Sequence, residues 1–507
     1  MLLVVAAILY SSVHVFGVAG SPAVPVHQAV SDAPPVTVSL VSAVRRAEVL
    51  PQRSTAVELS APVEGVPESS TDLSSCGAVD GTALAATTSG DIRASACLSQ
   101  LADVEPAVLG RFARSFDSDD SSAVTFATAL GERGSATATS VWWHDLTAAR
   151  QTELVADLPS VVGNLEGVPY DTRDLANRLT LSSTVAHLRG EVDAQGSGFL
   201  GASADSRRLV MLQQVEIALD RGREGDDAKR SLLSLDTVFP GKAAVAVGDV
   251  DTADNVTMMV PGMLYTVSNQ ITWWTDRAAD LHSAQDFWSS TLATDATASA
   301  ATNATIAWMG YRTPDLTNVL GLSLAEAGAV HLEDAVQGLT AARAGSEPHV
   351  TLIAHSYGST TASIALTSGK IHVDSFVALG SPGSVVAKAG DLAVTRGQVY
   401  AAAAALDPVA GSGFFGADPG STLYGATLLD VAGGTDPFTE QSLSAVLTHN
   451  RYFTPGSQSM RNLALIGTGH GDLAEGRQPI PGGPQPTDQP TLALVRPQDV
   501  NRESLGA

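Results

Sequence analysis

Residues 350–359 read VTLIAHSYGS, an apolar run typical of a buried strand, then a serine between small residues, then the start of a helical stretch. The segment from Ala354 to Gly358 nearly matches the Gly-x-Ser-x-Gly nucleophile elbow, a sharp strand-to-helix turn that exposes one serine hydroxyl. Ala354 replaces the usual first glycine and is the mildest such replacement. Ser356 is therefore the candidate nucleophile, and the alternative is an ordinary serine in a strand–turn–helix.

An acid and a histidine follow this elbow along the chain. A second apolar run spans residues 373–379, and a third, residues 399–406, ends in Asp407. His449 follows in a loop ahead of a helical stretch. A serine hydroxyl needs an imidazole to take its proton, and the imidazole needs a carboxylate to fix its tautomer. Ser356, Asp407 and His449 thus have the serine–acid–histidine order of α/β-hydrolases.

Each of these assignments has an alternative. Asp407 could instead cap the turn before a proline, a common role of aspartate, and Asp430 is the rival acid. His470 is the rival histidine, but the glycines on both sides of it are typical of an exposed loop, so we favour His449. His355, beside the nucleophile, is expected to point away from the cleft and to pack locally.

An oxyanion hole requires two backbone N–H groups near the nucleophile. Tyr357, directly after the serine, supplies the first of these donors. The apolar strand predicted at residues 256–260 leads into a loop, residues 261–264, from which Met263 supplies the second. An ordinary strand-ending turn is the alternative interpretation of this loop.

Strands and helices alternate through the C-terminal half of the chain. Strands are predicted at residues 243–247 and 305–309, and a helix at residues 326–344. The apolar residues expected on the buried face of this helix are Val330, Leu332, Val336 and Leu339. This alternation predicts an α/β fold with a mostly parallel central sheet and flanking helices, preceded by a helical N-terminal region.

The chain resembles the bacterial α/β-hydrolase family catalogued as domain of unknown function 1023. Besides the elbow, the resemblance rests on segments Trp142–Leu146, Pro159–Pro169, Arg173–Arg178, Asp251–Asn255 and His449–Ser457. It implies an α/β-hydrolase core with a serine nucleophile, assigns no substrate, and supports Ser356, Asp407 and His449 position by position. Arg173 and Arg178 are expected to brace the structure through carbonyls or carboxylates rather than to line the active site.

The composition limits the function further. The chain has 507 residues, of which 44% are hydrophobic and 16% charged, and its formal net charge is -24. That charge argues against nucleic acid as a partner, since phosphates demand a basic face. The sequence contains no cysteine–histidine cluster with metal-ligand spacing and no glycine-rich phosphate loop after a strand. We therefore expect no metal and no cofactor.

Five segments are predicted along the chain. Residues 1–20 resemble a secretory signal or membrane anchor without the usual basic residues, residues 21–93 form a linker of low order, and residues 475–507 form a disordered proline-rich tail. Residues 94–230 are helical and form a cap or a brace, and residues 231–474 form the catalytic domain. A secreted or envelope-associated protein is expected, with a cytoplasmic one as the alternative.

Two further features leave alternatives open. Cys76 and Cys97 would form a disulfide in an exported protein and stay reduced in the cytoplasm. A group of aromatic residues could form an apolar pocket near the oxyanion loop or belong to the core: Trp273, Trp274, Trp308 and Phe287.

The sequence predicts a serine hydrolase, most simply an esterase or lipase-like enzyme acting on a small or lipid-like carboxylic ester through an acyl-enzyme. The alternative is a non-catalytic α/β-hydrolase relative in the envelope or in a scaffold, because a fold does not guarantee an activity. The oligomeric state and the substrate stay undetermined by the sequence.

Overall fold

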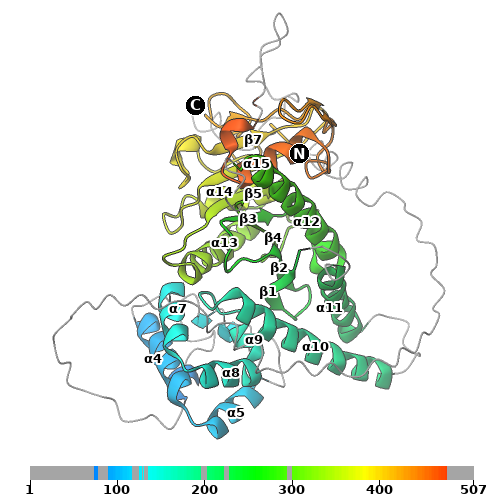
Figure 1. Cartoon of the computed structure of the whole chain (residues 1–507). Helices are drawn as coiled ribbons and strands as arrows, with labels where there is room; N and C mark the ends of the chain where they lie inside the picture. The colour runs from blue at the N-terminus through cyan, green and yellow to red at the C-terminus, as the bar shows by residue number, and fades with distance from the viewer. Residues whose placement is uncertain are drawn as a thin grey trace, which may run out of the picture.

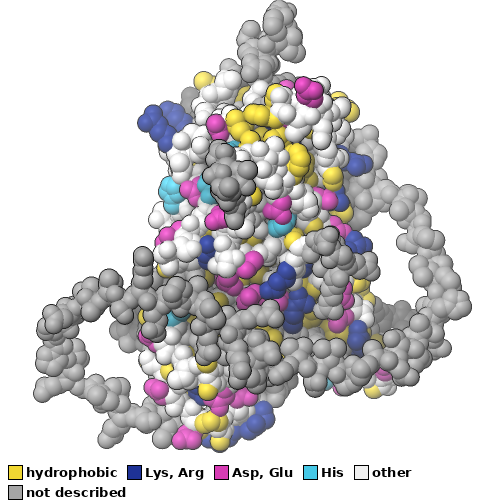
Figure 2. All heavy atoms as spheres, viewed as in Figure 1, with side chains coloured by type: hydrophobic (Ala, Val, Ile, Leu, Met, Phe, Trp, Pro, Cys, Tyr) yellow, Lys and Arg dark blue, Asp and Glu magenta, His cyan; other side chains and the backbone are white. Residues whose placement is uncertain are grey.

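The computed structural model describes residues 73–77, 89–116, 125–127, 129–130, 135–195, 203–221, 228–293, 300–474 and 476. The predicted signal-like segment, most of the predicted linker and nearly all of the predicted tail lie outside these residues. Within the described part, no helix is both long and apolar enough to cross a membrane. Lysine and arginine side chains lie in small separate groups among acidic ones on the face shown in Figure 2.

An eight-stranded sheet forms the centre of the molecule, in the order β1-β2-β4-β3-β5-β6-β7-β8 (Figure 1). β1 and β2 pair antiparallel, as do β2 and β4, and every pairing from β4 through β8 is parallel. This mostly parallel sheet confirms the predicted fold class. Its strands are β1 Arg230–Asp236, β2 Lys242–Gly248, β3 Asn255–Val260, β4 Asn303–Met309, β5 His349–His355, β6 Ser375–Leu379, β7 Val399–Ala402 and β8 Thr427–Leu428.

Helices cover both faces of this sheet and make a separate apolar cluster with each face. One face carries α10 Tyr170–Gln195, α11 Ala204–Asp220, α12 Val267–Thr291 and α15 Gln458–Gly467. The other carries α13 Ser323–Ala342 and α14 Tyr357–Ala365. The predicted buried face of α13 is confirmed for Leu332, Val336 and Leu339, whereas Val330 is 40% exposed because it turns to the solvent side of the helix.

Shorter elements lie in the connections between these strands and helices. β9 Gly434–Thr435 and β10 Ser442–Leu443 pair as a separate two-stranded sheet, and the 3-10 helices are η2 Ala389–Asp391 and η3 Gly471–Leu473. Because the strands from β3 through β7 are parallel, the loops that follow them meet along one edge of the sheet. Those loops include the elbow and the predicted oxyanion segment.

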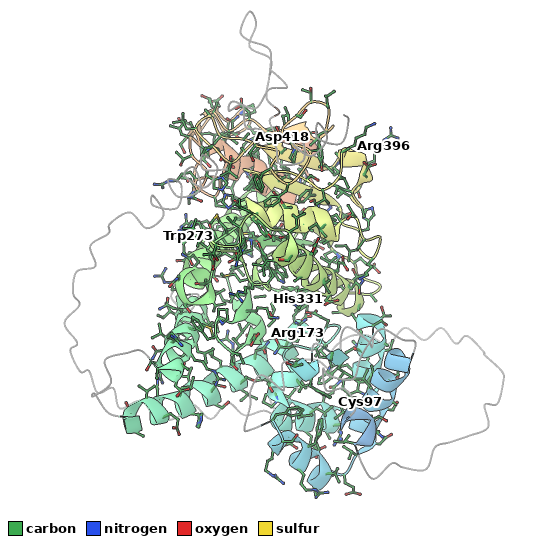
Figure 3. The ribbon with its side chains drawn as sticks, turned by 180° about the vertical axis from the view of Figure 1, so that it is seen from behind. Cys97, Arg173, Trp273, His331, Arg396 and Asp418 are labelled. Carbon is green, nitrogen blue, oxygen red and sulfur yellow. A yellow bond between two sulfur atoms is a disulfide. The ribbon has the colours of Figure 1, made fainter. Side chains whose placement is uncertain are left out.

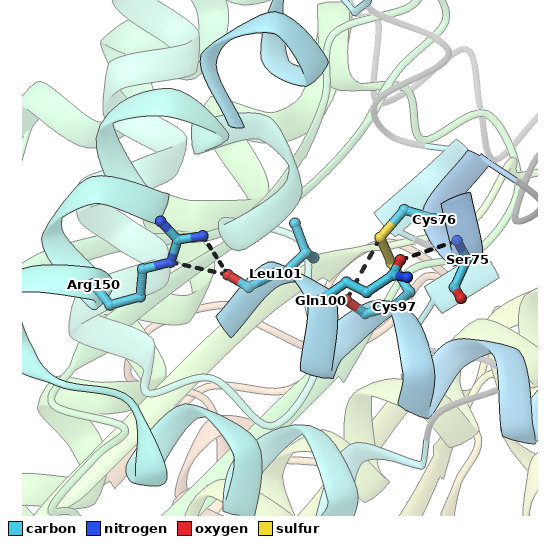
Figure 4. The surroundings of a disulfide bond; sticks show 6 residues. All are labelled: Ser75, Cys76, Cys97, Gln100, Leu101 and Arg150. Carbon is cyan, nitrogen blue, oxygen red and sulfur yellow. Dashed lines mark hydrogen bonds between the residues drawn. A yellow bond between two sulfur atoms is a disulfide. The ribbon is translucent and has the colours of Figure 1, made fainter. Parts of the chain in front are cut away.

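The helices before α10 form a third apolar cluster beside the β1 side of the sheet (Figure 1). They are α3 Ser74–Gly77, α4 Ser89–Asp103, α5 Pro106–Arg114, α7 Ala136–Asp145, α8 Ala148–Asp157 and α9 Pro159–Val162. Cys76 and Cys97 join α3 to α4 through a disulfide (Figure 4). The stretch 21–93 predicted as a linker therefore contains helical residues at 74–77 and 89–93, which belong to α3 and α4.

Arginine side chains fasten these helices to one another and to the sheet. The buried guanidinium of Arg173 donates to both carboxylate oxygens of Glu166, at 2.5 and 2.9 Å, where α10 meets the N-terminal helices (Figure 3). Arg178 donates to the carbonyl of Arg230 at 2.7 Å. Arg150 donates twice to the carbonyl of Leu101, which ties α8 to α4 (Figure 4). The brace interpretation of Arg173 and Arg178 agrees with these contacts.

Candidate active site

The turn between β5 and α14 places Ser356 at the carboxyl edge of the sheet. Ser356 has φ 56° and ψ -130°, a left-handed conformation that non-glycine residues adopt rarely and that is typical of strained functional positions. The close approach of two backbones holds this turn. A Cβ at Gly358 would lie 2.4 Å from the carbonyl oxygen of Pro261, so only glycine fits there.

The structure brings Ser356, His449 and Asp407 into one chain of hydrogen bonds. Nε2 of His449 lies 2.8 Å from Oγ of Ser356. Nδ1 of His449 lies 2.9 Å from each carboxylate oxygen of Asp407. Gly380, at the end of β6, makes room for this pair, because a Cβ there would lie 2.7 Å from Oδ2 of Asp407. All three side chains belong to buried residues.

Asp407 is held as a carboxylate. Burial raises its pKa, but the adjacent His449 and hydrogen bonds from His449, Tyr452 and the Ala410 N–H lower it more, so the pKa lies well below its usual value. The Tyr452 hydroxyl donates to Oδ2 at 2.6 Å and accepts from the N–H of Ala404 at 2.8 Å. Tyr452 was not predicted as a site residue, although it lies three residues after His449 in a segment that carried the family resemblance.

His355 contacts the site from behind. It packs locally, as expected, but its partner is His449: Nε2 of His355 lies 2.7 Å from the carbonyl oxygen of His449, and the ring centroids are 4.6 Å apart. Burial, together with the neighbouring His449, lowers the pKa of His355 to about 3. His355 is therefore neutral at pH 7 and carries its proton on Nε2, where it donates to that carbonyl.

The predicted oxyanion loop lies against the nucleophile. A Cβ at Gly262 would lie 2.7 Å from the Cβ of Ser356, which shows how closely the two segments approach. Met263 and Tyr357 line the same small pocket as Ser356. Within the described residues, neither backbone N–H has a hydrogen-bond partner. Both N–H groups are thus free to donate to a bound molecule.

A small apolar pocket opens at the nucleophile. We call it the Ser356 pocket, and it is lined by Met263, Val319, Leu320, Ser356, Tyr357, Pro382, Val409, Phe414 and Phe415. The aromatic residues suggested by the sequence do not line it: Trp274 and Trp308 are buried in the two cores, Trp273 stacks on Trp274, and Phe287 is 46% exposed. No described residue of the helical region 94–230 lines it either.

The rival residues lie elsewhere. The Asp430 carboxylate accepts from the N–H of Ala432 in its own loop. Nδ1 of His470 lies 3.3 Å from the hydroxyl of Thr468. Neither contacts Ser356 among the described residues, so position in the fold separates both from the hydrogen-bonded trio.

Three acidic residues among those described lie close enough to share a cation: Asp171, Asp249 and Asp251. Their oxygens already have partners. Asp251 accepts from the N–H groups of Tyr170 and Asp171 at the start of α10, and Asp171 pairs with Lys229. These contacts account for the cluster as a helix cap and an ion pair.

A family model and several mycobacterial proteins are similar to this chain. Residues 236–416 match the model of a family described as Alpha/beta hydrolase. An uncharacterized protein of Mycobacterium tuberculosis is 30% identical over 369 residues, which cover 65% of this chain and 55% of that protein. The chain therefore spans about half the length of that relative. An uncharacterized protein of Mycobacterium bovis is 35% identical over 222 residues, which cover 41% of this chain and 79% of that protein.

Solved structures with a similar arrangement are much more distant. Carboxyl esterase 2 from the mycorrhizal fungus Tuber melanosporum is 12% identical, with a TM-score of 0.30, and covers 50% of this chain and 90% of its own. A thermostable esterase from Pseudomonas putida is 14% identical, with a TM-score of 0.28, over 58% of this chain and 97% of its own. The family match and the mycobacterial relatives establish that the chain belongs to an α/β-hydrolase family.

Proposed function

We propose that this protein is a serine hydrolase that cleaves a small carboxylic ester. The observation that carries the proposal is the unbroken series of contacts from the carboxylate of Asp407 through His449 to the hydroxyl of Ser356. Each group stands where the chemistry needs it: a nucleophile, a base within hydrogen-bond distance, and a buried carboxylate that orients the base.

In the proposed reaction, Oγ of Ser356 attacks the ester carbonyl while Nε2 of His449 takes the hydroxyl proton. The N–H groups of Tyr357 and Met263 stabilise the oxyanion that forms. The tetrahedral intermediate collapses, the C–O bond to the alcohol breaks, and His449 gives its proton to the departing oxygen. Water, deprotonated by His449, then attacks the acyl-serine. The bond between the acyl carbon and Oγ of Ser356 breaks, His449 returns its proton to Oγ, and the carboxylic acid leaves.

Labelling with a fluorophosphonate probe tests the nucleophile. The wild-type chain should react covalently, and Ser356→Ala should abolish both the label and the hydrolysis of p-nitrophenyl acetate. Ser283→Ala, at an exposed serine of α12, is the matched control and should label like the wild type. Unchanged labelling of Ser356→Ala would contradict the proposal, and a wild-type chain that neither labels nor hydrolyses the ester would favour a non-catalytic relative.

Export from the cytoplasm is a second part of the proposal. The bonded pair Cys76–Cys97 supports it, because structural disulfides persist mainly in oxidising compartments. Cell fractionation, combined with alkylation of thiols before lysis, tests it. Two alkylated cysteines, or a protein found only in the cytoplasm, would contradict export without touching the proposed reaction.

A further inference from the structure

The Ser356 pocket lies on the acyl side of the nucleophile. Its lining includes Tyr357 and Met263, the proposed oxyanion donors, but not His449. During ester cleavage the imidazole must reach the oxygen of the leaving alcohol in order to protonate it. The alcohol therefore departs on the side of His449, and the pocket on the other side remains for the acyl group. This step rests on the proposed function.

One wall of the pocket is aromatic and fixed. The ring of Phe415 packs edge-on against Tyr357 with centroids 5.4 Å apart, and Phe414 packs edge-on against Phe415 at 4.8 Å. The backbone behind these rings is paired, because Ser384 donates to the carbonyl of Ala417 at 2.7 Å and Ala417 donates back to Ser384 at 2.9 Å. Paired backbone on both sides makes this wall part of the scaffold.

The aliphatic part of the lining is also tied down. Val319 and Leu320 come from the segment between β4 and α13. The hydroxyl of Tyr357 donates to the carbonyl of Gly321 at 2.6 Å and accepts from the N–H of Ala325 at 3.1 Å. These two bonds connect the aliphatic wall to the residue that follows the nucleophile, so the width of the pocket is set by the fold.

The space in this pocket is small, and the hydroxyls of Ser356 and Tyr357 are the polar side-chain groups among the residues that line it; the hydroxyl of Tyr357 is already bonded to Gly321 and Ala325. It measures about 330 Å³ including its mouth, and Ser356 is only 5% exposed. An apolar chain gains free energy by leaving water for such a pocket, whereas a charged or hydroxylated chain would lose its hydrogen bonds. A long chain would have to displace close-packed side chains.

We infer that the enzyme selects esters of short, apolar acyl groups, of acetyl to butyryl size, and that Phe414 and Leu320 set this limit. The class of alcohol is less restricted, because the alcohol lies outside the Ser356 pocket. Discrimination of this kind depends on the fixed walls, since a pocket that could widen would accept longer chains at little cost.

The hydrolysis of p-nitrophenyl acetate, butyrate, octanoate and palmitate by the full chain tests this inference, because the alcohol stays constant through the series. We expect kcat/KM for butyrate to exceed that for octanoate by about 100-fold, the discrimination that a tight apolar pocket can supply. Phe414→Ala and Leu320→Ala should each raise the octanoate-to-butyrate ratio by about 10-fold. Phe287→Ala, at an exposed phenylalanine outside the pocket, is the matched control and should keep the wild-type ratio.

The outcomes separate the inference from the function on which it rests. Equal hydrolysis of butyrate and octanoate by the wild type would overturn the short-acyl inference and leave the serine hydrolase intact. A wild-type preference for butyrate that Phe414→Ala and Leu320→Ala both leave unchanged would overturn the assignment of the walls. Absence of turnover with every ester would overturn the proposed function and the inference together.

Discussion

The Ser356 pocket and a second cavity at the β1–β2–β4 side of the sheet differ in what their polar groups do. The second, which we call the His331 cavity, is larger, at about 740 Å³ including its opening to the solvent. His331 lies on α13 near the N-terminal helices (Figure 3). The polar side chains of its lining include Asn164, Glu166, Asp236, Lys242 and His331.

Two of the polar side chains that line the His331 cavity, those of Asn164 and Glu166, hold neighbouring elements of the fold together through hydrogen bonds. Arg173 binds both oxygens of Glu166, and the amide of Asn164 exchanges two hydrogen bonds with the backbone of Leu235, at 2.9 and 3.0 Å. Next to the Ser356 pocket, Asp407 and His449 instead form a series of hydrogen bonds that ends on the hydroxyl of Ser356, and of these three residues only Ser356 lines the pocket. An aligned series of donors and acceptors, more than volume, distinguishes the candidate site at Ser356 from the His331 cavity.

The largest effect is expected from a substitution at Asp407, which lies at one end of the hydrogen-bonded series formed with His449 and Ser356. Asp407→Asn keeps the shape of the side chain but cannot stabilise the imidazolium, so kcat for a short-chain ester should fall by roughly 10⁴-fold. Steady-state kinetics with p-nitrophenyl butyrate measure this, and circular dichroism checks the fold. Activity within a few-fold of the wild type would mean that another carboxylate serves His449.

The next largest effect is expected beside the His331 cavity, where a substitution should lower the free energy of unfolding and leave kcat unchanged. Arg173→Met leaves the carboxylate of Glu166 without its buried partner, which should cost about 3–5 kcal/mol of the free energy of unfolding. Urea denaturation measures the cost, and the double variant Arg173→Met with Glu166→Gln should recover part of it. If kcat of the folded Arg173→Met protein fell as far as that of Asp407→Asn, the polar groups of the His331 cavity would not be limited to stabilising the fold. The proposed difference between the two sites would then be wrong.

A smaller effect is expected at Tyr452, which acts through Asp407 and is thus a positioning residue. Tyr452→Phe removes the donor to Oδ2 and leaves the N–H of Ala404 unpaired, so the pKa of Asp407 should rise and stability should fall by about 1–3 kcal/mol. We expect kcat to fall about 10-fold with KM nearly unchanged, because one hydrogen bond that stabilises the transition state is lost. A loss of stability with kcat intact would limit Tyr452 to a structural role.

The smallest effect concerns acid stability. Burial, with a smaller contribution from Lys242, lowers the pKa of His331 to about 4. The unfolded chain therefore binds a proton at this histidine more readily than the folded chain does. The contribution of His331 to stability is present above pH 6.5 and is lost as the pH falls from about 6.5 to 4. His331→Gln should flatten the pH dependence of unfolding in that range, by at most about 1.4 kcal/mol per pH unit. Urea midpoints at pH 7 and pH 4.5 measure this, with hydrolysis at pH 7 as the control. A slope equal to that of the wild type would show that the fold does not hold His331 as a neutral ring.

Local sequence predicted the elements whose pattern lies within one short segment. The strands β2, β3, β4 and β5 are mostly apolar runs, interrupted inside only by one threonine each in β3, β4 and β5, and a run of that kind is typical of a strand covered on both faces. No strand was predicted at β1, because its charged ends and two serines in RSLLSLD interrupt such a run. The elbow was likewise local, since its small residues are adjacent in sequence.

What the sequence determined by itself is the set of chemical groups and their order: an elbow serine, a later aspartate, a later histidine, and strands enough for a parallel sheet. The tertiary structure decided which groups meet. Tyr452 contacts Asp407 across 45 residues of sequence, and His355 contacts the carbonyl of His449 across 94. At such separations no periodic pattern in the sequence predicts which residues meet. Those contacts arise because parallel strands bring the loops that follow them to one edge of the sheet. The lining of the Ser356 pocket lies in such loops, and its packing is fixed only when the whole sheet is assembled.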